Sequence, residues 1–303
     1  MTTRSSAPLT SRFIDPKILA GSTNLQLIAK AVVEGFVAGL HRSPYHGFSL
    51  EFSEYREYSP GDDIRRVDWK VFGRTDRFFV KKYEGDTNTQ VYLLLDISRS
   101  MTFSSDLPSK LDYARYLAAA LAYFSVRQND AVGLITFDSR IQRFTPPRTR
   151  HGHLLTLLHH LEHVEVGART SVSEVLDELS KLIRKRSLVV LISDLYEDAA
   201  ALTRALRFFH HRGSDVLLFH VLDPMEIDLD LEGITTLEDL ESGEQLPFAS
   251  DFGREAYLEE VQRHIRTLRR ECRNVKIDYE LMRTNQPLDQ ALFRYLSNRT
   301  RRI

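Results

Sequence analysis

The sequence lacks the features that would support several common kinds of site. It contains one cysteine, Cys272, so neither an intrachain disulfide nor a cysteine zinc cluster can form. Neither G-x-x-x-x-G-K-S/T nor G-x-G-x-x-G occurs, which argues against a phosphate loop for nucleotides. The formal net charge is −1, so we expect no general electrostatic attraction to nucleic acid or to an acidic membrane.

Long hydrophobic runs are also absent. The most apolar stretch, residues 25–40 (LQLIAKAVVEGFVAGL), is interrupted by Lys30 and Glu34 and is too short to span a bilayer. Residues 1–17 contain no continuous apolar segment of signal-peptide length. With no membrane span expected and a cysteine content that suits a reducing compartment, the sequence predicts a soluble, cytoplasmic protein. Residues 25–40 are then predicted to form an amphipathic helix.

Apolar runs alternate with helical patterns over most of the chain. The runs, which are continuous as in strands buried on both faces of a sheet, are residues 91–96, 131–137, 188–193, 215–222 and 275–281. Helical spacing of apolar residues occurs at 109–130 and at about 151–163, 171–185, 198–212, 253–272 and 287–299. This alternation predicts an α/β fold with an open, doubly wound, mostly parallel sheet flanked by helices.

The sequence predicts two units. Residues 1–87 are expected to form a small N-terminal unit with a helix and short strands, because residues 48–87 alternate with period two and are rich in Phe and Tyr. Residues 88–303 are expected to form the α/β domain, with an inserted acidic hairpin or loop at 225–248. The only tryptophan, Trp69, lies in a highly charged block. We interpret it as a packing residue that anchors the N-terminal unit to the α/β domain, with a docking surface as the alternative.

Carboxylates and hydroxyls follow the predicted strands at positions suited to a ligand. Asp96 ends the first apolar run and is followed by Ser98 and Ser100, Asp194 ends another run, and Thr170 precedes a predicted helix. Ligands of doubly wound sheets bind at the carboxyl ends of strands. An oxygen-only ligand set suits a hard divalent cation such as Mg²⁺. The alternative is that these residues are helix caps and turn formers.

Asp96-Ile97-Ser98-Arg99-Ser100, followed by Thr170 and Asp194, resembles the metal-ion-dependent adhesion site of von Willebrand factor A domains. The resemblance implies a six-stranded, mostly parallel sheet. It also implies Mg²⁺, or alternatively Mn²⁺ or Ca²⁺, at a site made by Asp96, Ser98, Ser100, Thr170 and Asp194. An open position on such a metal suits an acidic side chain from a partner protein. Arg99 stands where many relatives have a small residue; it could meet an anionic partner or simply face solvent.

The upstream block REYSPGDDIRRVDWKVFGRTDRFFVKKYE and the C-terminal YELMRTNQPLDQALFRYLSNR resemble a bacterial branch of that family, domain of unknown function 58. The resemblance covers most of the chain from about residue 45. It implies an association with MoxR-type AAA+ ATPases and a role as adaptor or co-chaperone. Many relatives carry membrane helices ahead of this block, and none is expected here.

These observations favour a non-enzymatic protein-interaction module. The competing class is a Mg²⁺-dependent hydrolase or phosphatase that uses the same oxygen ligands, although the sequence shows no catalytic base beside them. His159, Glu162 and His163 also spell H-x-x-E-H, the inverted zinc-peptidase motif. No third zinc ligand is identifiable, so a solvated, histidine-rich helix face is the favoured interpretation of that motif.

Overall fold

The computed structural model describes the chain in several stretches separated by short gaps. These are residues 14–22, 24–40, 54–58, 67, 69–75, 77–82, 89–150, 152–169, 171–230, 235–240, 243, 245–248 and 250–300. Thr170 and the charged residues Asp62, Asp63, Arg65, Arg66 and Asp68 lie outside them.

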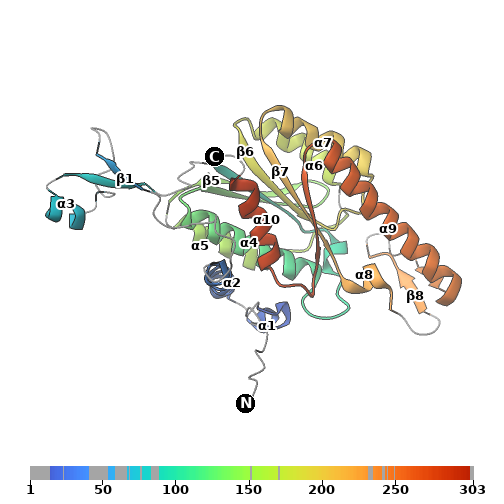
Figure 1. The fold of residues 1–303 in the computed structure, drawn as a ribbon. Coiled ribbons are helices and arrows are strands. Elements are labelled where there is room, and N and C mark those ends of the chain that lie inside the picture. Colours follow the sequence, from blue (N-terminus) through green and yellow to red (C-terminus); the bar gives the residue numbers. More distant parts are fainter. Residues whose placement is uncertain are drawn as a thin grey trace, which may run out of the picture.

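Among the described residues, six strands form one sheet in the order β10-β7-β6-β3-β4-β5 (Figure 1). The strands are β3 (Gln90–Asp96), β4 (Ala131–Phe137), β5 (Ile141–Arg148), β6 (Ser187–Ser193), β7 (Asp215–Leu222) and β10 (Asp278–Arg283). All neighbours pair in parallel except β4 and β5, which are antiparallel. The predicted α/β class with a mostly parallel sheet is therefore confirmed. The position of the first strand, β3, beside β6 in the middle of the sheet brings the ends of these two strands together.

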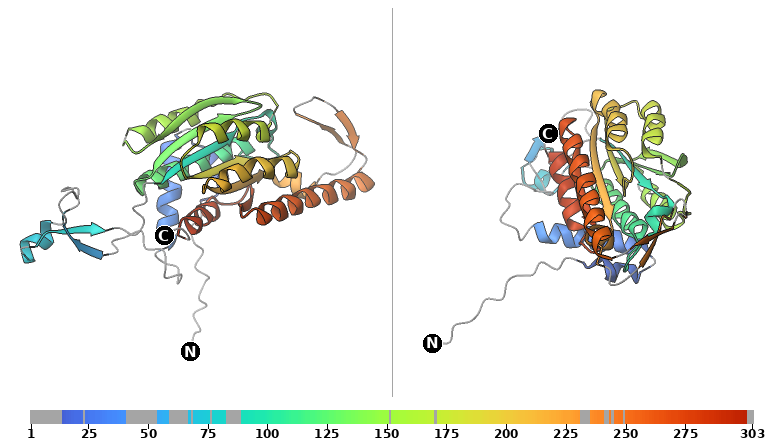
Figure 2. Two further views of the ribbon diagram at one scale, coloured as in Figure 1. Left: turned by 90° about the horizontal axis from the view of Figure 1, so that it is seen from above. Right: turned by 90° about the vertical axis from the view of Figure 1, so that its right-hand side faces the viewer.

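Helices cover both faces of this sheet, as the two views of Figure 2 show. The helices are α1 (Pro16–Ala20), α2 (Leu25–Leu40), α4 (Lys110–Arg127), α5 (His153–Glu162), α6 (Val172–Leu182), α7 (Ala199–His211), α8 (Pro224–Asp228), α9 (Ser250–Asn274) and α10 (Asp289–Thr300). Leu93 and Leu95 of β3 join a core with α2, α4, α5 and α10, whereas Tyr92 and Leu94 join one with α6, α7 and α9. Burial on both faces explains why β3 is a continuous apolar run.

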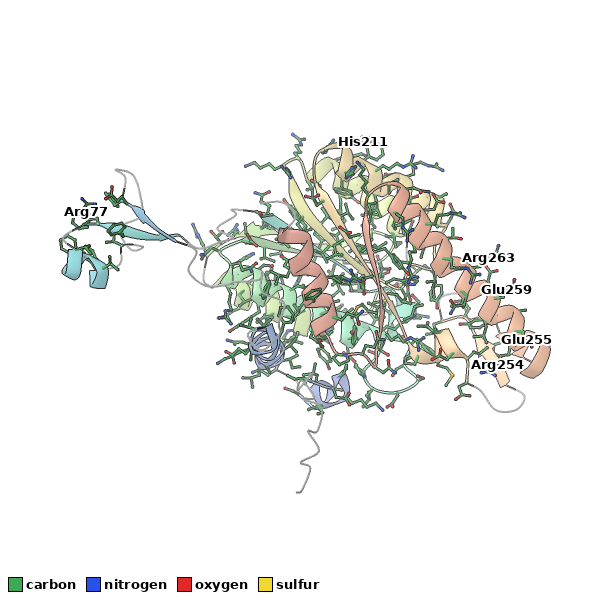
Figure 3. All side chains as sticks on the ribbon, in the orientation of Figure 1. Arg77, His211, Arg254, Glu255, Glu259 and Arg263 are labelled. Atoms are coloured by element: carbon green, nitrogen blue, oxygen red, sulfur yellow. The ribbon has the colours of Figure 1, made fainter. Side chains whose placement is uncertain are left out.

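The long helix α9 shows how the polar side of a covering helix faces outward. Val261 and Ile265 are buried against the body of the protein. Glu255, Glu259 and Arg263 project from the side of α9 that faces away from the sheet (Figure 3). This division of apolar and charged side chains is expected for a helix packed on one face only.

The predicted helix at residues 25–40 forms as α2 and packs on α4 in the main core. Farther along the chain, β1 (Glu54–Glu57) pairs antiparallel with β2 (Phe79–Lys82), and α3 (Trp69–Thr75) lies between them in sequence. Figure 1 shows this β1-α3-β2 segment away from the sheet. The helix of the expected N-terminal unit thus shares the core of the α/β body, and the division near residue 87 stays a prediction.

The interpretation of Trp69 as an anchor to the α/β domain is not supported by its surroundings. Trp69 is 58% exposed, and its ring contacts are edge-on to Phe72 and Phe78, within the β1-α3-β2 segment. Phe72 and Phe78 stack on each other with ring centroids 4.3 Å apart. The aromatic residues of this segment therefore pack among themselves, and the indole lies at their edge.

The segment at 225–248 contains α8 and a short hairpin of β8 (Thr235–Glu238) and β9 (Gln245–Phe248). Asp223 and Glu226 form a capping box at the start of α8: Asp223 accepts from the Met225 backbone N–H, and Glu226 accepts from the Asp223 N–H. This box satisfies backbone donors that the helix itself cannot pair. It also fixes the position of Glu226 at the end of β7.

Gly133 of β4 lies where the backbone of β5 comes closest, and we expect Gly133→Ala to destabilise the protein. A Cβ there would lie 2.8 Å from the Thr145 carbonyl oxygen and 2.9 Å from the Pro147 nitrogen, so the two strands would have to separate. We expect a loss of about 1–3 kcal/mol, measured by urea unfolding. The control is Gly35→Ala on α2, where a Cβ meets nothing within 4 Å and alanine favours the helix. Equal stabilities of the two variants would contradict the prediction.

Candidate functional site

Asp96 lies fully buried at the carboxyl end of β3. Its Oδ1 accepts a hydrogen bond from the Ser98 backbone N–H at 2.9 Å, and its Oδ2 accepts one from the Ser193 hydroxyl at 2.6 Å. The second bond is possible because β3 and β6 are neighbours and Ser193 ends β6. The carboxylate therefore has a defined orientation at the edge of the sheet where the sequence predicts a ligand.

The two serines after Asp96 lie together. The Ser98 and Ser100 hydroxyl oxygens are 3.0 Å apart, and Ser98 is fully buried. Ser98 precedes the short 3₁₀ helix η2 (Arg99–Thr102), but its side chain makes no capping hydrogen bond there. Helix capping thus does not account for this hydroxyl, although Asp96 does support the turn through the Ser98 N–H.

The loop before α6 is held against the Asp96–Ser100 loop by two backbone hydrogen bonds. The Arg99 N–H donates to the Ala168 carbonyl at 3.0 Å, and the Gly167 N–H donates to the Ile97 carbonyl at 2.7 Å. Asp138 supports the same loop by accepting from the Ala168 N–H at 3.2 Å. Thr170 is outside the described residues, so its part in the site stays a prediction.

Asp194, directly after β6, is fully buried and is paired with Lys110, a residue that the sequence analysis missed. The Lys110 ammonium donates to Asp194 Oδ2 at 2.8 Å and to Glu226 Oε1 at 2.6 Å. Glu226 was missed as well. Its capping-box spacing after Asp223 is visible in the sequence, but Lys110 gives no local signal of an ion pair with residues so far along the chain.

Burial and neighbouring charges determine the protonation of this cluster. Burial and, secondly, the Asp194 charge raise the pKa of Asp96 to about 7, against the hydrogen bonds that it accepts. Burial also raises the pKa of Glu226. For Lys110, burial alone would lower the pKa, but the Asp194 and Glu226 carboxylates outweigh it and hold the pKa above its ordinary value. When Asp96, Asp194, Glu226 and Lys110 are all ionised, the cluster contains three carboxylates and one ammonium. Its net charge is then −2.

This arrangement fits a hard divalent cation. No described residue donates a hydrogen bond to the buried Asp194 Oδ1, which leaves one oxygen of that carboxylate for another ligand. The other candidate ligands, Asp96, Ser98 and Ser100, also offer only oxygen atoms. Mg²⁺ prefers such ligands, and its charge would balance the two negative charges of the cluster. Asp96, Ser98, Ser100 and Asp194 would hold the ion.

Two possible catalytic bases near Asp194 are buried. His220 is fully buried beside it, and burial lowers the pKa of this imidazole to about 3, so it stays neutral. Its Nδ1 lies 2.7 Å from the Tyr279 hydroxyl. Lys110 is also fully buried and stays protonated. Neither group lies in an open cleft where it would meet a substrate.

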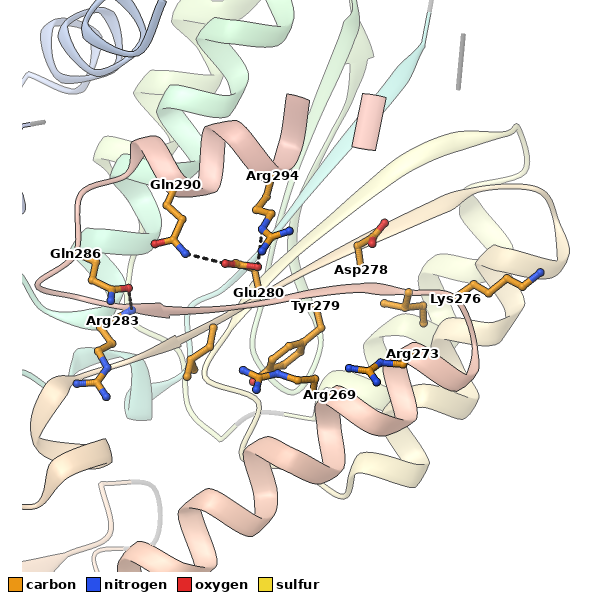
Figure 4. Close-up of a pocket in the computed structure, with 12 residues that line it drawn as sticks. Arg269, Arg273, Lys276, Asp278, Tyr279, Glu280, Arg283, Gln286, Gln290 and Arg294 are labelled. Carbon is orange, nitrogen blue, oxygen red and sulfur yellow. Dashed lines mark hydrogen bonds and ion pairs between the residues drawn. The ribbon is translucent and has the colours of Figure 1, made fainter. Parts of the chain in front are cut away.

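A pocket of about 710 Å³ lies along the edge strand β10, between α9 and α10 (Figure 4). Its charged lining includes Arg269, Arg273, Lys276 and Arg294, and Arg294 pairs with Glu280 at 3.0 Å. None of the candidate ligands lines this pocket. The candidate metal site therefore lies outside this pocket, at the buried carboxyl ends of β3 and β6.

Comparison with known proteins gives a family and a fold. The family model described as Protein of unknown function DUF58 matches residues 54–267. An uncharacterized protein of Mycobacterium tuberculosis is 29% identical over 95% of this chain and 91% of its own length. The crystal structure of an aerotolerance-related membrane protein from Bacteroides fragilis matches with a TM-score of 0.50 and 18% identity, over 70% of this chain and 99% of that one. The von Willebrand factor A (VWA) domain of SpRpn10 covers 67% of this chain and 93% of its own, at a TM-score of 0.40 and 12% identity.

The expected cytoplasmic location is wrong in view of these neighbours, since the Bacteroides fragilis protein with this fold is a membrane protein. The inference failed because a low cysteine content and the lack of a long apolar run do not specify the compartment in which a domain works. Within the part of the chain that the structure describes, no helix is long and apolar enough to cross a bilayer.

The raised pKa of Asp96 predicts a pH-dependent effect of Asp96→Asn in the presence of EDTA. The folded-state pKa is about 7, against an ordinary value of 3.8 for an aspartate, so ionisation of Asp96 costs stability increasingly between about pH 4 and pH 7, and fully above pH 7. Asparagine cannot ionise. The variant should therefore gain stability over the wild type at pH 8, by on the order of a few kcal/mol, and lose this advantage toward pH 4. Urea unfolding at pH 4 and pH 8 measures the difference in free energy of unfolding between the variant and the wild type. The same difference at both pH values would refute the raised pKa of Asp96.

Proposed function

We propose that this chain, which belongs to the family Protein of unknown function DUF58 and has a von Willebrand factor A-like fold, is a non-enzymatic protein-interaction module with a divalent cation at its binding site. The observation that carries the proposal is the convergence of buried Asp96 and Asp194 at the ends of the adjacent strands β3 and β6. The proposal is further supported by Asp194 Oδ1, which accepts no hydrogen bond from any described residue.

The bound cation, Mg²⁺ in this proposal, would supply positive charge and a coordination position for an acidic side chain of a partner protein. The residues of this chain orient and shield that position. Ser193 and the Ser98 N–H hold Asp96. Lys110 pairs with one oxygen of Asp194, and no described residue donates to the other. The exposed Arg99, next to the serines, would meet the negative charge of the partner.

For the partner we propose a MoxR-type AAA+ ATPase, with this chain as an adaptor or co-chaperone. The support is the resemblance of the N-terminal block and the C-terminal segment to a family branch associated with such ATPases. The exposed Tyr196 supports a protein partner, because its ring lies 5.1 Å from the Lys110 ammonium, at the rim of the site. Exposed aromatic residues of this kind are frequent in protein interfaces.

The competing function is a Mg²⁺-dependent hydrolase or phosphatase that uses the same ligands. It requires a base that can reach a metal-bound water, and Lys110 and His220, two candidates near Asp194, are buried. Turnover of a phosphatase or peptidase substrate above the Asp96→Ala background would favour the enzyme and overturn our proposal.

The first prediction from the proposal concerns Mg²⁺ itself. Saturation at about 100 times the Kd should stabilise the wild type by roughly 2.7 kcal/mol, or several degrees in Tm, and Asp96→Ala should lose this shift. The control is Asp198→Ala, which removes the N-cap of α7 but no proposed ligand. This variant should be about 1 kcal/mol less stable than the wild type and should keep the full increase in Tm with Mg²⁺. A Mg²⁺ shift that survives Asp96→Ala would exclude this site.

The matching binding experiment uses a purified MoxR-type ATPase from the same genome. Binding measured by calorimetry should require Mg²⁺, should be lost in Asp96→Ala, and should persist in Asp198→Ala. Binding that is equal in Mg²⁺ and in EDTA would refute a role for the metal in partner recognition.

A second prediction concerns Lys110. Lys110→Met removes the ammonium and leaves Asp194 and Glu226 as buried carboxylates without their partner, so in EDTA it should cost about 3–5 kcal/mol. Mg²⁺ should restore more stability to this variant than to the wild type, because both Asp194 oxygens become available. Asp198→Ala, which leaves Lys110 and its two carboxylates in place, is the control and should show the wild-type Mg²⁺ response. Equal Mg²⁺ responses of Lys110→Met and the wild type would argue against a metal next to Asp194.

A further inference from the structure

A second group of side chains that can bind a metal ion lies at the end of α5. It shares no residue with the candidate site at Asp96 and Asp194. One ligand atom each of His159, Glu162 and His163 lies within 4.8 Å of the others. His159 and His163 are one helical turn apart, with ring centroids 4.2 Å from each other. Both histidines are exposed, and Glu162 is half-buried. The three side chains therefore converge on one point at the surface.

A hydrogen bond prepares one of the histidines for metal binding. The Nδ1 atom of His163 lies 2.9 Å from the His159 carbonyl oxygen, which can only accept, so Nδ1 carries the hydrogen. In the neutral ring, Nε2 then has its lone pair available. Metal-ligating histidines commonly donate their other ring N–H to a backbone carbonyl in this way, which fixes both the tautomer and the ring orientation.

The surrounding contacts hold the end of α5 in place. Arg115 of α4 donates from Nε to the Leu161 carbonyl at 2.7 Å and from Nη2 to the Glu162 carbonyl at 3.1 Å. Glu162 Oε1 accepts the backbone N–H of Leu25, the first residue of α2, at 3.1 Å. The carboxylate thus joins α5 to the start of α2, and it does so at the same point where the two imidazoles lie.

We propose that His159, Glu162 and His163 form a second metal site, selective for a transition cation such as Zn²⁺, which fastens α2 to α5. Two imidazoles and one carboxylate suit Zn²⁺, whereas Mg²⁺ prefers oxygen ligands. The site is structural and not peptidolytic, because the Glu162 carboxylate, the general base that an H-x-x-E-H peptidase needs, is hydrogen-bonded to Leu25 and faces the metal as a ligand. The ion would stabilise the arrangement in which α2 is docked.

The test uses the full chain with Zn²⁺ or Co²⁺ titrated after removal of metals by EDTA. Zn²⁺ should raise the Tm of the wild type, and Co²⁺ should give the visible absorption of a nitrogen- and oxygen-ligated ion. His159→Ala and His163→Ala should each lower the affinity by at least about tenfold, since loss of a direct ligand costs no less than loss of its supporting hydrogen bond. His211→Ala is the control. It removes an exposed histidine from the end of α7 (Figure 3) and should leave Zn²⁺ binding unchanged.

The proposed stabilisation of the contact between α2 and α5 by Zn²⁺ is tested by hydrogen exchange. Zn²⁺ should slow exchange of the α2 amides in the wild type and not in Glu162→Gln, which can still accept the Leu25 N–H but lacks the charged ligand. Asp96→Ala should keep the whole Zn²⁺ response, which separates this site from the proposed Mg²⁺ site. A Zn²⁺ shift that persists in His159→Ala, or Zn²⁺ binding without protection of α2, would overturn the proposal.

Discussion

The buried ion pair between Lys110 and Asp194 is the interaction on which the functional edge of the sheet depends. Lys110 begins α4, Asp194 follows β6, and Glu226 belongs to α8 after β7, so one ammonium joins three elements at their ends. An ammonium fully removed from water is tolerated only because both carboxylates contact it. The same pairing occupies one Asp194 oxygen, and no described residue donates to the other, which our proposal assigns to a metal ion. Packing and the proposed binding chemistry therefore share a single buried charge.

Much of the fold could be predicted because strands buried on both faces of a parallel sheet need continuous apolar runs. β3, β6 and β7 fall on three such runs. The antiparallel strand β5 was not predicted, since its sequence, IQRFTPPR, is largely exposed and contains two prolines, which only an edge strand tolerates. Trp69 was assigned to the wrong neighbours because its size indicates packing but not the surface against which it packs.

The candidate site was predictable to the extent that it is local in sequence. Asp96, Ser98 and Ser100 lie within five residues, and the position of each after a strand fixes the edge of the sheet to which it belongs. Lys110 could not be found in this way, because its partners come from β6 and α8, far away in sequence. The charge that neutralises a buried carboxylate depends on the tertiary structure, and a pattern of residue types along one element contains no information about it.

The paired backbone bonds between the Ile97–Arg99 and Gly167–Ala168 loops give the site a mechanical property. A Cβ at Gly167 would lie 2.5 Å from Oδ2 of Asp138, the residue after β4, so the Gly167–Ala168 loop is also held against that loop with no room for an added methyl group. Loops that are fastened at two points and packed this closely cannot shift independently. Any force applied to Arg99 is passed to Ala168 and, three residues later, to Ser171 and the start of α6. A displacement of the Ile97–Arg99 loop at the end of the sheet would thus also move the start of α6, which covers one face of the sheet.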